Sequence, residues 1–440
     1  MTSGAQFRII KSKWYIRIIL TKEKGGPPMK GKGISRREFL KGTGGLVAGA
    51  AAAQFPTILR AAPKEILIGA VEPLTGTAAE AGQMATWGLE LAIDHINKAG
   101  GIKSMGGAKL ALKVADSESK NEVGAMKAEQ LIRQDITCLV GAFLSGVTMA
   151  VSKVADRQKM PFVIDVSTAD QITQQGFEYT FRIFPTTTRL LDTGLDGIAE
   201  ITKARPIKKV VMVHISEFQG KSVTDLLLPM IPKKGLKWDV VKTITYPENA
   251  MSLASEVGEV KSLKPDAILV VARQRDAIML VQEMYKQRFD VDGIFGMVSP
   301  GFADPGFQKE KLSEYSFNVT PWHDEVQPFA KKVAEEYQSK YKKPFIMNGA
   351  YPYDTILVIA DALERAKSID KDALRKALRE THLTQKTGIG RVIEFDEKGD
   401  NKGAGAGLMQ IQQGKGKIVY PSFAATAKVV YPATPWKDRG

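Results

Sequence analysis

A few polar residues stand where an apolar run ends and a helical pattern begins. Ser145 follows the apolar run 138–142 and directly precedes the helical pattern 146–157. A hydroxyl at such a junction, together with the free amide groups of the first helical turn, suits a bound carboxylate. The same hydroxyl could instead cap its own helix. Two threonines are further candidates: Thr148 lies one turn further on, and Thr168 follows the next apolar run.

Other motif-like stretches lack residues that their chemistry needs. Residues 217–222 resemble a phosphate-binding loop, but Ile215 stands where the first glycine belongs. Ser145 could be mistaken for a hydrolase nucleophile, but Phe143 and Val147 replace the flanking glycines of that motif. We therefore expect no enzyme activity and no cofactor.

The sequence contains few residues that could bind a metal or carry out thiol chemistry. The four histidines lie far apart and show no ligand spacing. The single cysteine, Cys138, stands in an apolar run, which predicts a buried strand residue and no disulfide within the chain. We therefore expect no metal site.

Arg36 and Arg37 open a pattern that is typical of a bacterial export signal. They are followed by Glu-Phe-Leu-Lys and then by the uncharged, weakly apolar run 42–53. The paired arginines favour the twin-arginine route, which exports folded proteins. The run is too short for a spanning helix, which needs about 20 apolar residues. We expect cleavage near residue 62 and an extracytoplasmic protein after it.

The charge balance changes at the end of this leader. Residues 1–62 contain 12 Lys and Arg against 2 Asp and Glu, and the rest of the chain contains 50 against 46. The formal net charge of +14 therefore resides mostly in the leader. The nearly balanced remainder gives no basic footprint for nucleic acid. Within the leader, Met29 opens a normal basic head, so residues 1–28 are either a spurious extension or an unusually long head region.

The remaining 378 residues alternate short apolar runs with helical patterns, which predicts an α/β fold of two doubly wound parallel-sheet lobes. After residue 320, helices are expected at 325–341, 350–366 and 371–379, and short strands at 391–395 and 408–412, with a loop at 413–417. Strands are expected at 66–71, 110–115, 138–142, 162–165, 210–215, 239–245, 267–272 and 294–298, and helices at 78–99, 122–134, 146–157, 221–231, 252–262 and 277–287.

Several stretches together carry a resemblance to a known family. They are Ile68–Gly76, Gly88–Ile102, Asp116–Ser119, Gly141–Thr148, Pro161–Ile164, Thr180–Pro185 and Phe395–Asp400. In this order and at these spacings, the chain resembles the substrate-binding proteins of branched-chain amino-acid ABC transporters, which are Leu/Ile/Val-binding-like. The resemblance covers essentially all of residues 65–440.

The resemblance implies a type I periplasmic binding protein fold, in which two lobes joined by a three-segment hinge close on a ligand. The chain should cross between lobes near Pro185, Pro321 and Gly388. The first lobe is then 65–185 plus 321–387, and the second is 186–320 plus 388–440. It also implies a periplasmic location, a small-molecule ligand and an ABC permease in the inner membrane as partner. We expect a monomer that does not bind nucleic acid.

In the first lobe, the resemblance implies that Ser145, Thr148 and Thr168, with Val166 beside them, bind a ligand carboxylate. The second lobe departs from the amino-acid-binding pattern. Gln219, beside Phe218, replaces one expected tyrosine, and Arg273 replaces another.

The family also places an acid near Met297 to pair with the ligand's ammonium group, and none stands there. Because a buried ammonium without a counter-charge is costly, we expect a carboxylate ligand without an α-ammonium, such as an aromatic, aliphatic or dicarboxylic acid. Arg273 would then pair with a second anionic group or lie in solvent. Two alternatives stay open: a true branched-chain amino-acid binder, and the ligand-binding component of a receptor.

Overall fold

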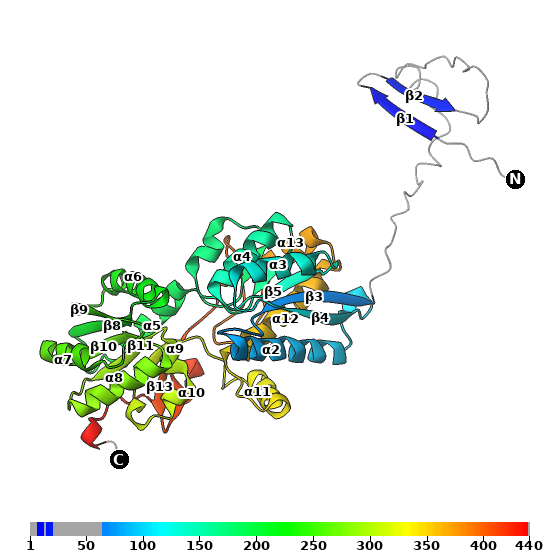
Figure 1. Cartoon of the computed structure of the whole chain (residues 1–440). Coiled ribbons are helices and arrows are strands. Elements are labelled where there is room, and N and C mark those ends of the chain that lie inside the picture. The colour runs from blue at the N-terminus through cyan, green and yellow to red at the C-terminus, as the bar shows by residue number, and fades with distance from the viewer. Residues whose placement is uncertain (1–6, 13–14, 21–63, 439–440) are drawn as a thin grey trace. The chain divides into compact units, whose positions relative to one another are not determined.

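The computed structural model describes residues 7–12, 15–20 and 64–438 (Figure 1). The chain divides into two compact units, residues 1–61 and 62–440. In the first, β1 (Phe7–Ser12) and β2 (Tyr15–Leu20) form an antiparallel pair. The expected export signal, with Arg36 and Arg37, lies outside the described residues. Within the described ranges, no helix combines the length and apolar character that crossing a membrane requires.

The second unit contains two sheets. The first sheet has five parallel strands in the order β4-β3-β5-β6-β7. Its strands are β3 (Glu65–Glu72), β4 (Lys109–Asp116), β5 (Cys138–Gly141), β6 (Phe162–Ile164) and β7 (Thr180–Arg182). Buried apolar side chains line both faces of the central strand, as expected for a parallel sheet covered on both sides.

The second sheet has the order β14-β13-β12-β11-β10-β8-β9, and β13 pairs antiparallel with both β12 and β14. Its strands are β8 (Lys209–Ile215), β9 (Asp239–Tyr246), β10 (Ala267–Val271), β11 (Gly293–Met297), β12 (Phe317–Thr320), β13 (Gly407–Gln412) and β14 (Lys415–Tyr420). The expected loop 413–417 is wrong in part, because Gln413 and Gly414 alone make the turn. Both have positive φ, which fits a two-residue hairpin turn.

Helices cover both faces of each sheet. On the first sheet, α2 (Ala79–Lys98), α11 (Pro328–Tyr341), α12 (Met347–Ala366) and α13 (Lys371–Arg379) share one core cluster. The opposite face carries α3 (Asn121–Ile132) and α4 (Ser145–Arg157). On the second sheet, α5 (Thr187–Ile201) and α6 (Phe218–Lys233) cover one face. The other carries α7 (Ala254–Leu263), α8 (Gln274–Lys286), α9 (Pro300–Ala303) and α10 (Pro305–Gln308).

The third segment that connects the two lobes, between α13 and β13, packs on the first sheet before it reaches the second sheet. The strand expected at 391–395 is wrong, because this stretch makes only isolated bridges, such as Leu383 with Ile393. Ile393 and Phe395 pack in the core cluster of the first sheet, and Asp400 makes a parallel bridge with Arg182 of β7. The chain joins the second sheet only at β13.

Candidate ligand-binding site

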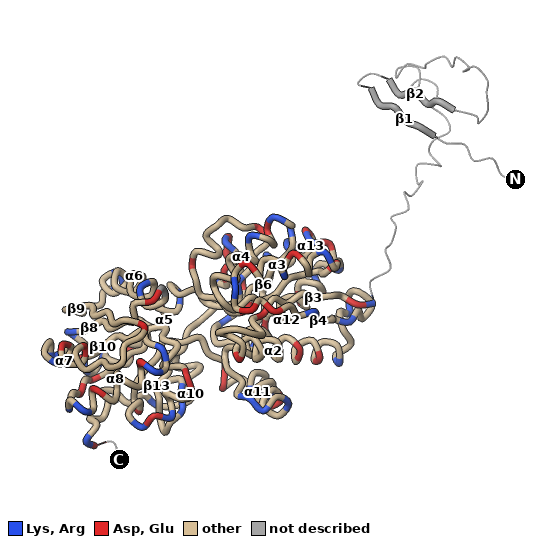
Figure 2. Tube along the Cα trace, in the orientation of Figure 1, with Lys and Arg blue, Asp and Glu red and all other residues tan. Residues whose placement is uncertain are grey.

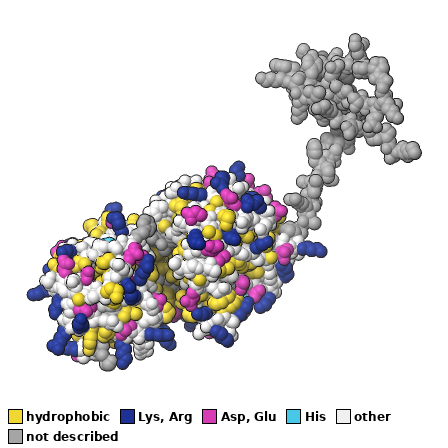
Figure 3. All heavy atoms as spheres, viewed as in Figure 1, with side chains coloured by type: hydrophobic (Ala, Val, Ile, Leu, Met, Phe, Trp, Pro, Cys, Tyr) yellow, Lys and Arg dark blue, Asp and Glu magenta, His cyan; other side chains and the backbone are white. Residues whose placement is uncertain are grey.

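The two sheets place the candidate site at the carboxyl ends of their parallel strands, where open α/β sheets bind ligands. In the space-filling view, a furrow separates the two lobes of the second unit (Figure 3). Acidic and basic residues alternate along the chain in both lobes (Figure 2). The site's specificity must therefore come from individual residues rather than from a field of one sign.

In the first lobe, Ser145 and Ser167 lie together. Ser145 is the first residue of α4, and its half-buried hydroxyl oxygen accepts a hydrogen bond from Ser167 Oγ at 3.1 Å. The N-cap residue is Leu144, whose side chain caps no amide. The first-turn amides of α4 thus have no side-chain cap, which is the arrangement that suits an anion. Sequence reasoning missed Ser167, although it stands in the same stretch as Thr168.

The other predicted first-lobe residues, Thr148, Val166 and Thr168, differ in burial and in hydrogen bonding. The Thr148 hydroxyl is buried and donates to the Leu144 carbonyl at 3.0 Å, so it is engaged within its own helix. Val166 is buried. Thr168 is half-buried, and its carbonyl accepts hydrogen bonds from Thr187, at 2.8 Å from N and 3.1 Å from Oγ1. Thr168 therefore lies next to the first crossing segment.

A completely buried arginine holds the loop that carries Thr168. Arg182 Nη1 donates to the carbonyls of Ser167 and Ala169, at 3.3 and 2.7 Å, and its Nη2 donates to Thr173 Oγ1 at 2.6 Å. Its Nε forms an ion pair with Asp400 Oδ1 at 2.8 Å. This network fixes both ends of the 167–173 loop, and no local sequence pattern indicates its partners.

The second lobe contains an acid that sequence reasoning missed. Glu217 is the N-cap residue of α6, and its carboxylate takes two hydrogen bonds from Arg273. Nε of Arg273 lies 3.1 Å from Oε1, and Nη2 contacts Oε2. Glu217 raises the pKa of Arg273. The Arg273 side chain is 61% exposed and that of Glu217 only 15%. An acid at the start of a helix was the available signal.

The other predicted second-lobe residues, Gln219, Met297 and Phe218, lie in different environments. Gln219 Nε2 donates to the Val298 carbonyl at 3.4 Å, which links the start of α6 to the end of β11. Met297 is fully buried in the second-lobe core. Phe218 begins α6, and its side chain is not among those described.

Two large aromatic residues, Trp322 and Tyr351, pack in the protein interior. Trp322 joins Ile389, Met409 and other apolar residues in a core cluster near the crossings. Tyr351 is buried, with its ring edge-on to Phe184 at 4.6 Å between centroids. Both therefore contribute to the interior.

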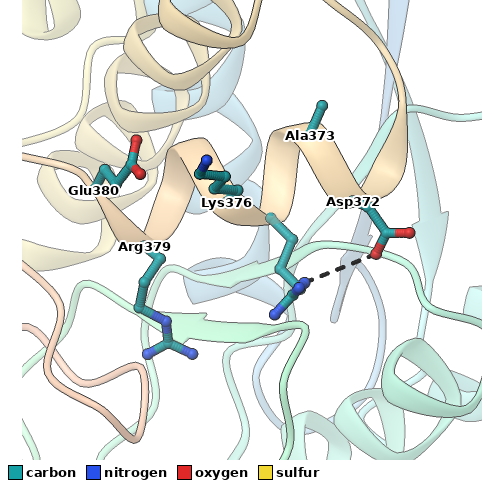
Figure 4. A pocket seen from close by; sticks show the side chains of 6 residues that line it. Asp372, Ala373, Lys376, Arg379 and Glu380 are labelled. Atoms are coloured by element: carbon teal, nitrogen blue, oxygen red, sulfur yellow. Dashed lines mark ion pairs between the residues drawn. The ribbon is translucent and has the colours of Figure 1, made fainter.

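A separate surface hollow of about 420 Å³ lies along α13 (Figure 4). Its arginines are already engaged. Arg375 lies over the Tyr179 ring and Arg379 over the Phe181 ring. Arg379 also donates to the Asp396 carbonyl. Only residues 372–380 line the hollow, so it includes none of the predicted ligand residues.

Comparison with known proteins identifies the family. A family model described as periplasmic binding protein matches residues 65–417. The chain belongs to this family. A relative named Leu/Ile/Val-binding protein homolog 8, from Brucella abortus (strain 2308), is 26% identical over 391 residues and covers 85% of this chain and 94% of the relative. Homolog 7 from Brucella suis biovar 1 (strain 1330) is 25% identical over 384 residues, with 84% and 95% covered.

Solved structures confirm the predicted type I periplasmic binding protein fold. The branched-chain amino acid transporter substrate-binding protein LivJ from Streptococcus pneumoniae, in complex with isoleucine, matches with a TM-score of 0.67 at 22% identity. That match covers 84% of this chain and 100% of LivJ. A solute-binding protein from R. palustris in complex with benzoate matches with a TM-score of 0.65 at 19% identity, covering 83% and 98%.

Proposed function

We propose that this periplasmic binding protein captures a small carboxylate-bearing ligand between its lobes and delivers it to an ABC importer of the branched-chain amino-acid type. The names of its relatives support the transporter type. The Ser145–Ser167 pair at the uncapped start of α4 supports a carboxylate contact. Lobe closure on the ligand is the signal to the permease.

The ligand lacks an α-ammonium group in this proposal, and the Glu217–Arg273 pair is the observation that carries it. Glu217 is the N-cap acid of α6, and both of its oxygens already accept from one guanidinium. A ligand ammonium would have to displace Arg273 from a paired arrangement, which is the stronger type of charge-assisted bond. An aromatic or aliphatic carboxylate makes no such demand.

A branched-chain amino acid is the second candidate, because the relatives are named for leucine, isoleucine and valine, and LivJ was solved with isoleucine. The two candidates differ in what Arg273→Ala does. Removing the guanidinium frees Glu217, so calorimetry should show leucine affinity rising by about tenfold relative to benzoate, which corresponds to about 1.4 kcal/mol. Tight leucine binding by the unmodified protein contradicts the ammonium-free proposal.

Export by the twin-arginine route is part of the proposal and is tested separately. Replacing Arg36 and Arg37 together by lysine should retain the full chain in the cytoplasm. Cell fractionation measures the result, with Lys30→Arg as a matched control that keeps the basic head. Unchanged export of the double variant would contradict this route and leave the ligand proposal untouched.

A further inference from the structure

Two carboxyl groups lie buried together at the carboxyl edge of the first sheet. Glu72 is the last residue of β3, and Asp165 follows β6. Both are 0% exposed. The strand between them, β5, ends at Gly141, where an added Cβ would lie 3.2 Å from Glu72 Oε1. The Glu72 carboxyl therefore packs directly against the turn that leads to Ser145.

The hydrogen bonds of the two groups are unequal. Asp165 Oδ1 accepts from the Val166 amide at 2.6 Å, and the Phe143 amide also stabilises this carboxylate. Among the described atoms, both Glu72 oxygens and Asp165 Oδ2 are buried without a partner. Two ionised carboxylates only accept hydrogen bonds. A proton on Glu72 lets it donate to Asp165, which satisfies a buried oxygen on each group.

The surrounding charges agree with a single shared proton. Burial raises the pKa of Glu72 well above its usual range, and the neighbouring Asp165 raises it further. Burial also raises the pKa of Asp165, while Glu72 and the backbone amides act in the opposite sense. Among the described residues, no cation contributes to either pKa shift. The nearby buried cation, Arg182, pairs with Asp400 instead.

We infer that Glu72 and Asp165 share one proton, and that this pair is a positioning device for the turns that carry Ser145 and Ser167. Within this pair, Asp165 accepts from the amides of Phe143 and Val166, which stand just before those two serines. The inference that it governs ligand affinity rests on the proposed function. Losing the proton would place two negative charges together in a dry site, beside a site for an anionic ligand. Affinity should then fall by about tenfold per pH unit above the pKa of the pair.

Infrared spectroscopy tests the shared proton without any ligand. Above about pH 7, where Asp354 and the exposed acids are ionised, the full chain should show a protonated-carboxyl stretching band that disappears as pH rises further and is absent from Glu72→Gln over that range. Glu65→Gln is the matched control, because Glu65 is an exposed acid at the opposite end of the same strand. A band that survives in Glu72→Gln, or no band at all, overturns the shared proton.

The positioning role is tested by binding and by amide exchange. Benzoate and isoleucine serve as calorimetric probes. Wild type and Glu65→Gln should lose affinity as pH rises through the band's midpoint, whereas Glu72→Gln should keep it, because its amide donates to Asp165 at every pH.

Should neither probe bind, the proposed ligand classes fail. Exchange then decides the positioning role: amides 143–148 and 166–168 should become less protected in wild type than in Glu72→Gln above that midpoint. Identical behaviour of the two proteins refutes the role. Asp165→Asn, which keeps an acceptor for Val166, replaces Glu72→Gln if that variant does not fold.

Discussion

The buried Arg182–Asp400 pair allows a sharp test of how burial changes the value of an ion pair. In Arg182→Met, the Asp400 carboxylate loses its cation, and the Ser167 and Ala169 carbonyls lose their donor. Breaking a buried pair on one side costs about 3–5 kcal/mol, because it leaves an uncompensated charge. We expect a free energy of unfolding lower by that amount.

The chain offers a control with nearly the same geometry. Arg205 Nε lies 2.8 Å from Asp292 Oδ2, the same separation as in the Arg182 pair, but Arg205 is 61% exposed. Solvent screens such a pair, so Arg205→Met should cost at most about 1 kcal/mol. The comparison therefore varies burial while keeping the ion-pair distance constant.

Chemical denaturation of both variants, with thermal unfolding in parallel, measures the difference. For a unit of this size, the Arg182→Met loss corresponds to a Tm decrease on the order of 4–6 °C. The double variant Arg182→Met/Asp400→Asn should be milder than Arg182→Met, because it removes the stranded charge. Equal losses for Arg182→Met and Arg205→Met would refute the reasoning, as would a double variant no more stable than Arg182→Met.

Three further predictions concern the ligand site, the helix packing and the crossings. Ser145→Ala should weaken carboxylate binding by roughly 10- to 100-fold, which is the value of a hydrogen bond to a charged group. Ser152→Ala on the same helix should leave binding unchanged, because the Ser152 hydroxyl is buried without a partner in the described structure. Calorimetry with benzoate compares the two variants. Gly88→Ala should lower the free energy of unfolding by about 1–3 kcal/mol in chemical denaturation, because the new Cβ would lie 2.3 Å from the Gly349 carbonyl oxygen. Gly258→Ala on α7 has room for a Cβ and should raise the free energy of unfolding by up to about 1 kcal/mol. A Gly88→Ala variant as stable as the wild type would contradict this packing. Burial raises the pKa of Asp354 from 3.8 to about 6, so the folded state binds this proton more tightly than the unfolded state does. The free energy of unfolding should therefore fall as pH rises from about 4 to about 6. Asp354→Asn should flatten that part of the stability profile, and an unchanged profile would contradict the assignment.

The sequence predicted the fold well because parallel strands leave a strong local pattern. Apolar runs such as 210–215 and 267–272 correspond to β8 and β10 with a change of one residue at one end. The failures lie where structure depends on distant partners. The 391–395 stretch has the composition of a strand, but only isolated bridges form there, because its neighbours are the separate residues Leu383 and Asn401.

The candidate site was only partly predictable for the same reason. Ser145 follows from local position, since a strand end and a helix start are visible in the sequence. The partners of Ser145 and Arg273 are not visible, because Ser167 and Glu217 stand 22 and 56 residues away from them. A side chain's availability for a ligand depends on such contacts, so residue type alone could not decide the role of Arg273.

These contacts bear on the kind of ligand that the second lobe can accept. Glu217 is held by Arg273, and Asp276, which is almost fully buried, is paired with Arg275 at 3.0 Å. Each of these acids therefore already has a cation, and under the proposed function a ligand ammonium that approached either acid would have to separate an existing pair. The energy of that separation opposes amino-acid binding and leaves a simple carboxylate unaffected. The relative affinities for leucine and benzoate thus report directly on whether Glu217 and Arg273 remain paired when the lobes close.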